Sequence, residues 1–218
     1  MHFEILVEDK SGKNVLEILM PKILGQNHSW KIFAFNGIGH IPKNVRNAKE
    51  VANQMLLNNL PRLFRAYGQT FAGYHNYAAA LILVCDLDDK CQKTFRDQLY
   101  NILISCNPKP KTRFCFAIEE GEAWFLGDLN AIKAAYPKAK DAVLNSYVND
   151  SICGTWEKLA DAIYKGGEAA LSAKGCQAVG SEKSRWSEKI TPHMSIDNNQ
   201  SPSFCHFREK IRELADLS

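Results

Sequence analysis

The feature that most constrains this fold is an all-apolar run from Ala79 to Cys85, which an acidic cluster follows at once. The run is too short to cross a bilayer. It is typical of a strand that is buried on both faces of a parallel sheet. Asp86, Asp88 and Asp89 come directly after it. The sequence therefore predicts a parallel sheet that carries carboxylates at one edge.

On both sides of this run, segments with the pattern of strands alternate with segments that have the pattern of helices. Further strands are predicted at residues 3–7, 30–35 and 113–118. Helical spacing of apolar residues predicts helices at 15–24, 45–67, 90–104 and 119–126, and Pro61 is expected to kink or divide the second of them. Strands that alternate with helices predict an α/β fold with an open, mainly parallel sheet flanked by helices.

The C-terminal part of the chain has a different pattern. We expect the α/β domain to span residues 1–136, and residues 137–218 to form a helical and loop extension packed on the same domain. Helices are predicted at 156–164 and 204–217. The segment 175–202 is rich in Ser, Asn and Gly, and it is expected to be a long ordered loop.

Composition excludes several classes of protein. Lys and Arg number 27 against 24 Asp and Glu, and this small net charge excludes a histone-like or a polyacidic protein. Seven cysteines without a CxxC pair predict reduced, mostly buried thiols. The acidic N-terminus lacks the features of a signal peptide, so we expect a cytoplasmic protein that has no membrane segment. No Gly-rich P-loop motif occurs, which argues against ATP binding of that kind.

Acidic residues follow three of the predicted strands. Glu8 ends the first strand, Asp86 and Asp88 end the third, and Glu119, Glu120 and Glu122 follow the fourth. Ligands of open parallel sheets bind at the carboxyl ends of the strands. Clustered carboxylates repel one another unless a cation neutralises them, and all-oxygen clusters suit Mg²⁺ or Mn²⁺. The alternative is that these acids are solvated loop residues or helix caps, Asp88 or Asp89 capping the next helix.

Two resemblances give these acids a possible function. Glu8 after a strand, with the later Asp86-Leu87-Asp88, resembles the Toprim domain of topoisomerases, primases and OLD-type nucleases. The segment IEEGEAWFLGD, residues 118–128, resembles a motif of the bacterial family known as domain of unknown function 4276. Further matches to that family follow in order along the chain: Trp156-Glu157-Lys158-Leu159, Tyr164-Lys165, Lys189-Ile190, Pro192-His193-Met194 and Ser201-Pro202-Ser203-Phe204.

The resemblance implies a Toprim-like, Mg²⁺-dependent nuclease of a bacterial defence system, which sometimes works beside a partner ATPase. In this interpretation Glu8, Asp86, Asp88 and Glu119 are metal ligands, and Glu8, Glu122 and Lys189 are catalytic. Lys158 is a second candidate for the lysine that stabilises the transition state. Related nucleases carry an acid four residues after the first Glu, where this chain has Gly12. That departure leaves open whether one or two metal ions bind.

Basic residues are concentrated in two stretches that predict contacts with a phosphate backbone. The candidates for nucleic-acid binding are Lys43, Arg46, Arg62, Arg65, Lys109 and Lys111. Aromatic residues follow the first stretch and offer surfaces on which bases stack. A solvated helix face beside core aromatic residues is the alternative interpretation.

Three hypotheses remain at this stage. The first is a nuclease or nuclease-like effector that acts on DNA or RNA. The second is a non-catalytic Toprim-like module that binds nucleic acid or a partner ATPase, and Gly12 favours it. The third is a small-molecule hydrolase or phosphatase at the same sheet edge. An oligomer is possible under each hypothesis, because the sequence does not determine the oligomeric state.

Overall fold

The computed structural model describes residues 1–42, 55–75 and 77–216. Its centre is one four-stranded sheet, in which every strand is parallel to its neighbours and the order is β2-β1-β3-β4. The strands are β1 (His2–Val7), β2 (Ser29–Ala34), β3 (Ala79–Asp86) and β4 (Thr112–Ala117). These are the four predicted strands, and the prediction of an open parallel α/β sheet flanked by helices is confirmed.

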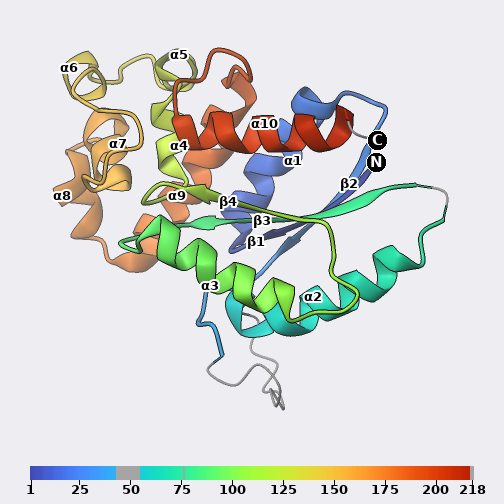
Figure 1. The fold of residues 1–218 in the computed structure, drawn as a ribbon. Coiled ribbons are helices and arrows are strands. Elements are labelled where there is room, and N and C mark those ends of the chain that lie inside the picture. The colour runs from blue at the N-terminus through green and yellow to red at the C-terminus, as the bar shows by residue number, and fades with distance from the viewer. Residues whose placement is uncertain (43–54, 76, 217–218) are drawn as a thin grey trace.

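Helices cover both faces of the sheet (Figure 1). The helices α1 (Lys10–Leu24) and α10 (Pro202–Asp216) lie on one face, and α2 (Leu56–Ala72) and α3 (Gln92–Ile104) lie on the other. The chain steps outward from β1 to β2 and then returns past β1 to β3. Right-handed crossovers in opposite directions place their helices on opposite faces. The strand order therefore reverses between β1 and β3, where open sheets bind ligands.

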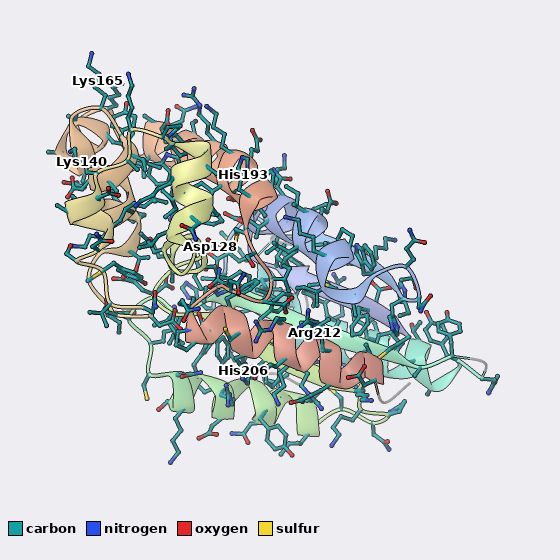
Figure 2. All side chains as sticks on the ribbon, turned by 90° about the horizontal axis from the view of Figure 1, so that it is seen from above. Asp128, Lys140, Lys165, His193, His206 and Arg212 are labelled. Carbon is teal, nitrogen blue, oxygen red and sulfur yellow. The ribbon has the colours of Figure 1, made fainter. Side chains whose placement is uncertain are left out.

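The C-terminal helices complete the core above the sheet. In chain order they are α4 (Glu122–Leu126), α5 (Leu129–Ala135), α6 (Asp141–Leu144), α7 (Thr155–Ile163), α8 (Gly167–Ser172), α9 (Cys176–Ile190) and the 3-10 helix η1 (Thr191–His193). Seen from above in Figure 2, α10 lies along the sheet. Trp124, Trp186 and Phe204 from these helices share one apolar core with Phe3 and Leu19 of the first strand and helix. The extension thus has no separate core of its own in the described chain.

Two predictions about secondary structure need correction, one of a loop and one of a break in a helix. Residues 175–202 were expected to form a loop, but α9 occupies most of this segment. Its sequence is mostly polar, and its helical conformation depends on burying Trp186 and Ile190 against α1 and the core. The predicted helix 45–67 begins outside the described residues. In the described part, Pro61 does not divide α2, which continues to Ala72.

The cysteines and the helix lengths test two further expectations. All seven cysteines are described and are free thiols, but only Cys85, Cys106 and Cys115 are buried. The expectation of mostly buried thiols was therefore wrong. No described helix is both long enough and apolar enough to cross a membrane.

Gly68 makes the closest approach between α2 and the loop that precedes β4. A Cβ atom at this position would lie 1.9 Å from the carbonyl oxygen of Pro108. We expect Gly68→Ala to lower the free energy of unfolding by about 1–3 kcal/mol, because backbone must shift to admit the methyl group. Gly180→Ala in α9 is the control. A Cβ atom at Gly180 would have nothing within 4 Å. Helix propensity should therefore make Gly180→Ala neutral or stabilising by up to about 1 kcal/mol. Urea unfolding of both variants measures the difference, and equal stabilities would contradict the contact.

Candidate functional site

A cavity of about 230 Å³ opens at the carboxyl edge of the sheet, beside the point where the strand order reverses. Its polar walls come from four elements that are distant in the sequence. Glu8 follows β1, Asp86 ends β3, Glu122 begins α4, and Lys183 comes from the middle of α9. Apolar side chains complete the walls, including Val84, Trp124 and Phe125. Asp9, the residue before α1, also lines the cavity, so four carboxylates and one ammonium group share a partly apolar enclosure.

Glu8 and Asp86 both line this cavity and contact each other. The backbone N–H of Asp86 donates to Oε2 of Glu8 at 3.4 Å. Burial raises the pKa of Glu8 to about 7, and the charges of Asp88 and Asp9 contribute in the same direction. Burial also raises the pKa of Asp86 well above its usual range, with further contributions from Glu8 and Glu122. Two carboxyl groups in this position do not ionise together easily unless a cation lies near them.

Lys183 supplies positive charge on the other side of the cavity. Its Nζ lies 3.3 Å from Oε2 of Glu122 and 3.3 Å from Oε1 of Glu120. Burial alone would lower the pKa of Lys183, but the charges of Glu122, Glu120 and Asp86 outweigh burial and raise that pKa above its ordinary value. Glu122 is 4% exposed. The ammonium group is therefore held charged among carboxylates that are largely removed from water.

Asp88 does not line the cavity. Its predicted place beside Asp86 required extended backbone through both residues, but β3 ends at Asp86 and Asp88 has a φ of 50°. This left-handed conformation turns its carboxylate to a different neighbour, Lys90, with which it forms an ion pair. Residues two apart in the sequence share one side of a strand only while the backbone stays extended, and β3 stops before Asp88.

Glu119 also differs from its predicted position as a metal ligand. Its carboxylate accepts the backbone N–H groups of Cys153, Gly154 and Thr155, at 3.2, 3.0 and 2.9 Å, and the hydroxyl of Thr155. These donors lie at the start of α7, whose first-turn N–H groups lack partners within the helix. The residue therefore anchors α7 to the end of β4.

We expect Glu119→Gln to lower the free energy of unfolding at neutral pH by about 1–3 kcal/mol, because a charged acceptor of several hydrogen bonds is lost. Burial acts to raise the pKa of Glu119, but the hydrogen bonds from Thr155, Gly154 and Cys153 outweigh it and lower that pKa below 4.5. The stabilisation is therefore present above pH 4.5 and disappears as pH falls through the lowered folded pKa. Denaturant unfolding across this range, with the exposed Glu188→Gln as control, checks both features. A pH-independent difference would contradict the role.

The structure separates the predicted lysines from the cavity. Lys189 is exposed on α9, with its Nζ 5.6 Å from the ring centroid of Tyr136, and it does not line the cavity. Lys158 donates to Oγ of Ser146 at 3.0 Å. The lysine that reaches the carboxylates is Lys183, which the sequence does not single out, because the composition of its segment predicts a loop. Its helical spacing with Val179, Trp186 and Ile190 was the available signal.

The predicted basic residues have different locations. Lys43 and Arg46 lie outside the described residues. Arg62 and Arg65 are exposed on α2, and Arg62 donates to Oδ1 of Asn59 at 3.4 Å. Lys109 and Lys111 are exposed in the loop that contacts α2 at Gly68. The described members of this set therefore lie on the α2 side of the sheet, opposite α1 and α10.

The donor set of the cavity is compatible with a hard cation that binds few protein ligands. Within residues 1–42, 55–75 and 77–216, no group of three or more His, Cys, Asp or Glu is placed to hold a metal ion. Mg²⁺, however, is commonly bound by one or two carboxylates, with water and substrate phosphate completing its coordination. Glu8 and Asp86 fit this arrangement. Glu119 and Asp88 do not join them in the described structure.

Comparisons with known proteins leave the family open. No protein-family model matches the chain, and no curated protein or solved structure matches it. The likeness to the domain of unknown function 4276 and to Toprim proteins therefore remains an expectation based on the quoted residues.

Proposed function

We propose that the protein hydrolyses phosphodiester bonds of nucleic acid. The carboxylate cavity is its active site, and Glu8 and Asp86 bind Mg²⁺ or Mn²⁺ there. The observation that supports this most strongly is the position of this carboxyl pair at the reversal of strand order, with the pKa of Glu8 raised to about 7. A pair of acids that repel each other in an enclosed site is relieved by a bound cation. When bound, Mg²⁺ would neutralise charge that develops on the phosphate.

Residues around the pair are suited to an anionic substrate. The N-terminus of α1 reaches the cavity through Ser11 and Gly12, and helix N-termini favour bound phosphate, although the carboxylate of Asp9 caps this end by accepting the N–H of Gly12 at 2.7 Å. Lys183 offers a fixed ammonium group that can contact a phosphate oxygen in the partly apolar enclosure. Glu8 is either a metal ligand or the base that takes a proton from the attacking water, since a base with a pKa near the working pH is effective.

Glu122 has a supporting role in this proposal. Its carboxylate is buried and paired with Lys183, and its position holds that ammonium group toward Asp86. The resemblance also implies a defence function and a partner ATPase, and both belong to the proposal. Gating by such a partner would leave the purified chain inactive while its metal site remained able to bind.

The direct test is cleavage by the purified, EDTA-treated protein after addition of Mg²⁺ or Mn²⁺. Substrates are plasmid, linear duplex DNA, single-stranded DNA and total tRNA. We expect cleavage that requires the cation and is lost in Asp86→Ala. Asp89→Ala is the matched control, because this neighbouring carboxylate is exposed and does not line the cavity. Equal activity of wild type and Asp86→Ala would contradict the proposal.

Thermal melting separates a gated nuclease from a protein without a metal site. Excess Mg²⁺ or Mn²⁺ should raise the melting temperature by mass action, and Asp86→Asn should abolish that increase. A protein that neither cleaves nor responds to either cation would instead support the binding module. The observation that favours this second candidate is the ion pair of Asp88 with Lys90, which removes one predicted ligand from the site.

A further inference from the structure

A groove of about 780 Å³ lies on the opposite face of the sheet from the carboxylate cavity, between α2 and α3. Its residues come from the segment after β2, from α2, from the loop after β3 and from α3. The loop after β3 also connects the two sites, since Asp86 lines the cavity and Lys90 lines the groove. The two hollows are therefore both bordered by the chain at the carboxyl end of β3.

The charges of this groove are of one sign. Arg65 and Lys90 line it, and no carboxylate does so among the described lining residues. Lys90 also forms an ion pair with Asp88, in the loop that follows Asp86. A nucleic acid with one phosphate at Glu8 and Asp86 could place neighbouring phosphates near the positive groups of the groove, Arg65 and Lys90.

The remaining surface of the groove suits a nucleobase. Leu57, Phe95 and Ile102 provide an apolar floor, while the amides of Gln98 and Asn101 can both donate and accept hydrogen bonds. These groups match the flat apolar face and the polar edge of a base. A pocket of this volume holds a ligand of nucleotide size rather than a duplex.

The rim of the groove is held in position by a tight turn. Gly39 has a φ of 69°, and a Cβ atom there would lie 2.2 Å from Oδ1 of Asn58. The next residue, His40, donates its backbone N–H to the same oxygen at 2.9 Å. The imidazole of His40 belongs to the exposed edge of the groove, where an aromatic ring can stack on a base.

We infer that this groove binds single-stranded nucleic acid, receiving a nucleotide that adjoins the bond at the carboxylate cavity. The inference rests on the proposed function for the place of cleavage, but binding in the groove can be measured without cleavage. Arg65 and Lys90 contact phosphate, and the floor and amides receive the base. A single strand is required because the base must leave its partner to enter the groove.

The test is fluorescence anisotropy with a labelled single-stranded oligonucleotide of about twelve nucleotides, in EDTA so that no cation-dependent cleavage occurs. We expect Arg65→Glu to weaken binding at least about tenfold. Lys165→Glu makes the same change of charge, and the two variants should keep the melting temperature of the wild type. Lys165 is exposed and extends from the far end of the helical extension, away from the sheet (Figure 2). We expect this control to bind within about twofold of the wild type.

Two further measurements test whether the groove recognises a base and whether it prefers a single strand to a duplex. Asn101→Leu should weaken binding of the normal oligonucleotide more than binding of an abasic one, and duplex DNA of the same sequence should bind less tightly than the single strand. Equal losses in Arg65→Glu and Lys165→Glu, or duplex binding as tight as that of the single strand, would overturn the inference. Asp86→Asn distinguishes the two proposals: it should abolish cleavage and keep binding in EDTA. If Arg65→Glu weakens binding but neither cation changes cleavage or the melting temperature, the nuclease proposal is refuted and the inference about the groove stands.

Discussion

Lys183→Met is expected to lower the free energy of unfolding by about 3–5 kcal/mol at neutral pH. The substitution removes the one cation that lines the carboxylate cavity among the described residues. It leaves Glu122, Glu120 and Asp86 facing one another without that charge. Removing one partner of a buried ion pair is strongly destabilising because the remaining charge stays buried. Guanidinium unfolding with a full transition measures the effect.

The pH dependence of this variant gives a second signature. Lys183 itself stays protonated between about pH 5 and pH 8 because its pKa is raised, so pH dependence in this range comes from the carboxyl groups that face it. In Lys183→Met, the unpaired carboxyl groups have still higher folded pKa values. A raised folded pKa of an acid means stability that falls as pH rises, so the loss should be larger at about pH 8 than at about pH 5.

Two control variants make the interpretation specific. Lys189→Met alters an exposed lysine of the same helix and should change stability by less than about 1 kcal/mol. Adding Glu122→Gln to Lys183→Met should restore part of the loss, because the two effects are coupled through one contact. A stability of Lys183→Met within about 1 kcal/mol of the wild type would show that the ion pair is not formed in solution.

Glu8→Gln is expected to stabilise the protein in EDTA at about pH 8 by up to roughly 3 kcal/mol. The folded pKa of Glu8 is raised from 4.5 to about 7, chiefly by burial, and this difference corresponds to roughly 3 kcal/mol. The wild type therefore loses stability as pH rises from 4.5 through about 7, because the folded state resists ionisation. Glutamine has a similar shape but does not ionise, so the benefit should nearly vanish at about pH 4, below the unfolded pKa.

A bound cation should reverse this order of stabilities. In excess Mg²⁺ or Mn²⁺, the wild type gains stability by mass action, whereas Glu8→Gln lacks one proposed ligand and should gain less. Glu17→Gln on α1 is the control, since this exposed carboxylate pairs only with Lys13 at 3.4 Å in the described structure. It should change stability by less than about half a kcal/mol at every pH. Identical pH profiles for Glu8→Gln and the wild type would show that Glu8 is not enclosed as described.

Lys183→Met and Glu8→Gln alter the same cavity but are expected to change the free energy of unfolding in opposite directions. Lys183 relieves the repulsion of its carboxylates, while Glu8 maintains that repulsion. A group that lowers stability in the absence of a ligand is often present for function rather than folding. The raised pKa of Glu8 and its position at the edge of the sheet therefore make it the first residue to test for chemistry.

Local sequence patterns were sufficient to predict the sheet and one side of the site. The apolar run 79–85 and its three companion strands follow from periodicity, which depends only on neighbouring residues. Glu8 and Asp86 follow directly, because parallel strands bring their carboxyl ends to one edge.

Tertiary structure decided which other groups reach that edge. The left-handed backbone at Asp88 and the hydrogen bonds of Glu119 to the start of α7 remove two predicted ligands from the cavity. Lys183 enters it because α9 packs on α1, a contact between segments far apart in the chain. The groove between α2 and α3 likewise exists only once both helices cover the same face of the sheet. By itself, the sequence determined where strands end, because that information is local. The direction of each side chain beyond the strand depended on single backbone conformations and on distant packing partners.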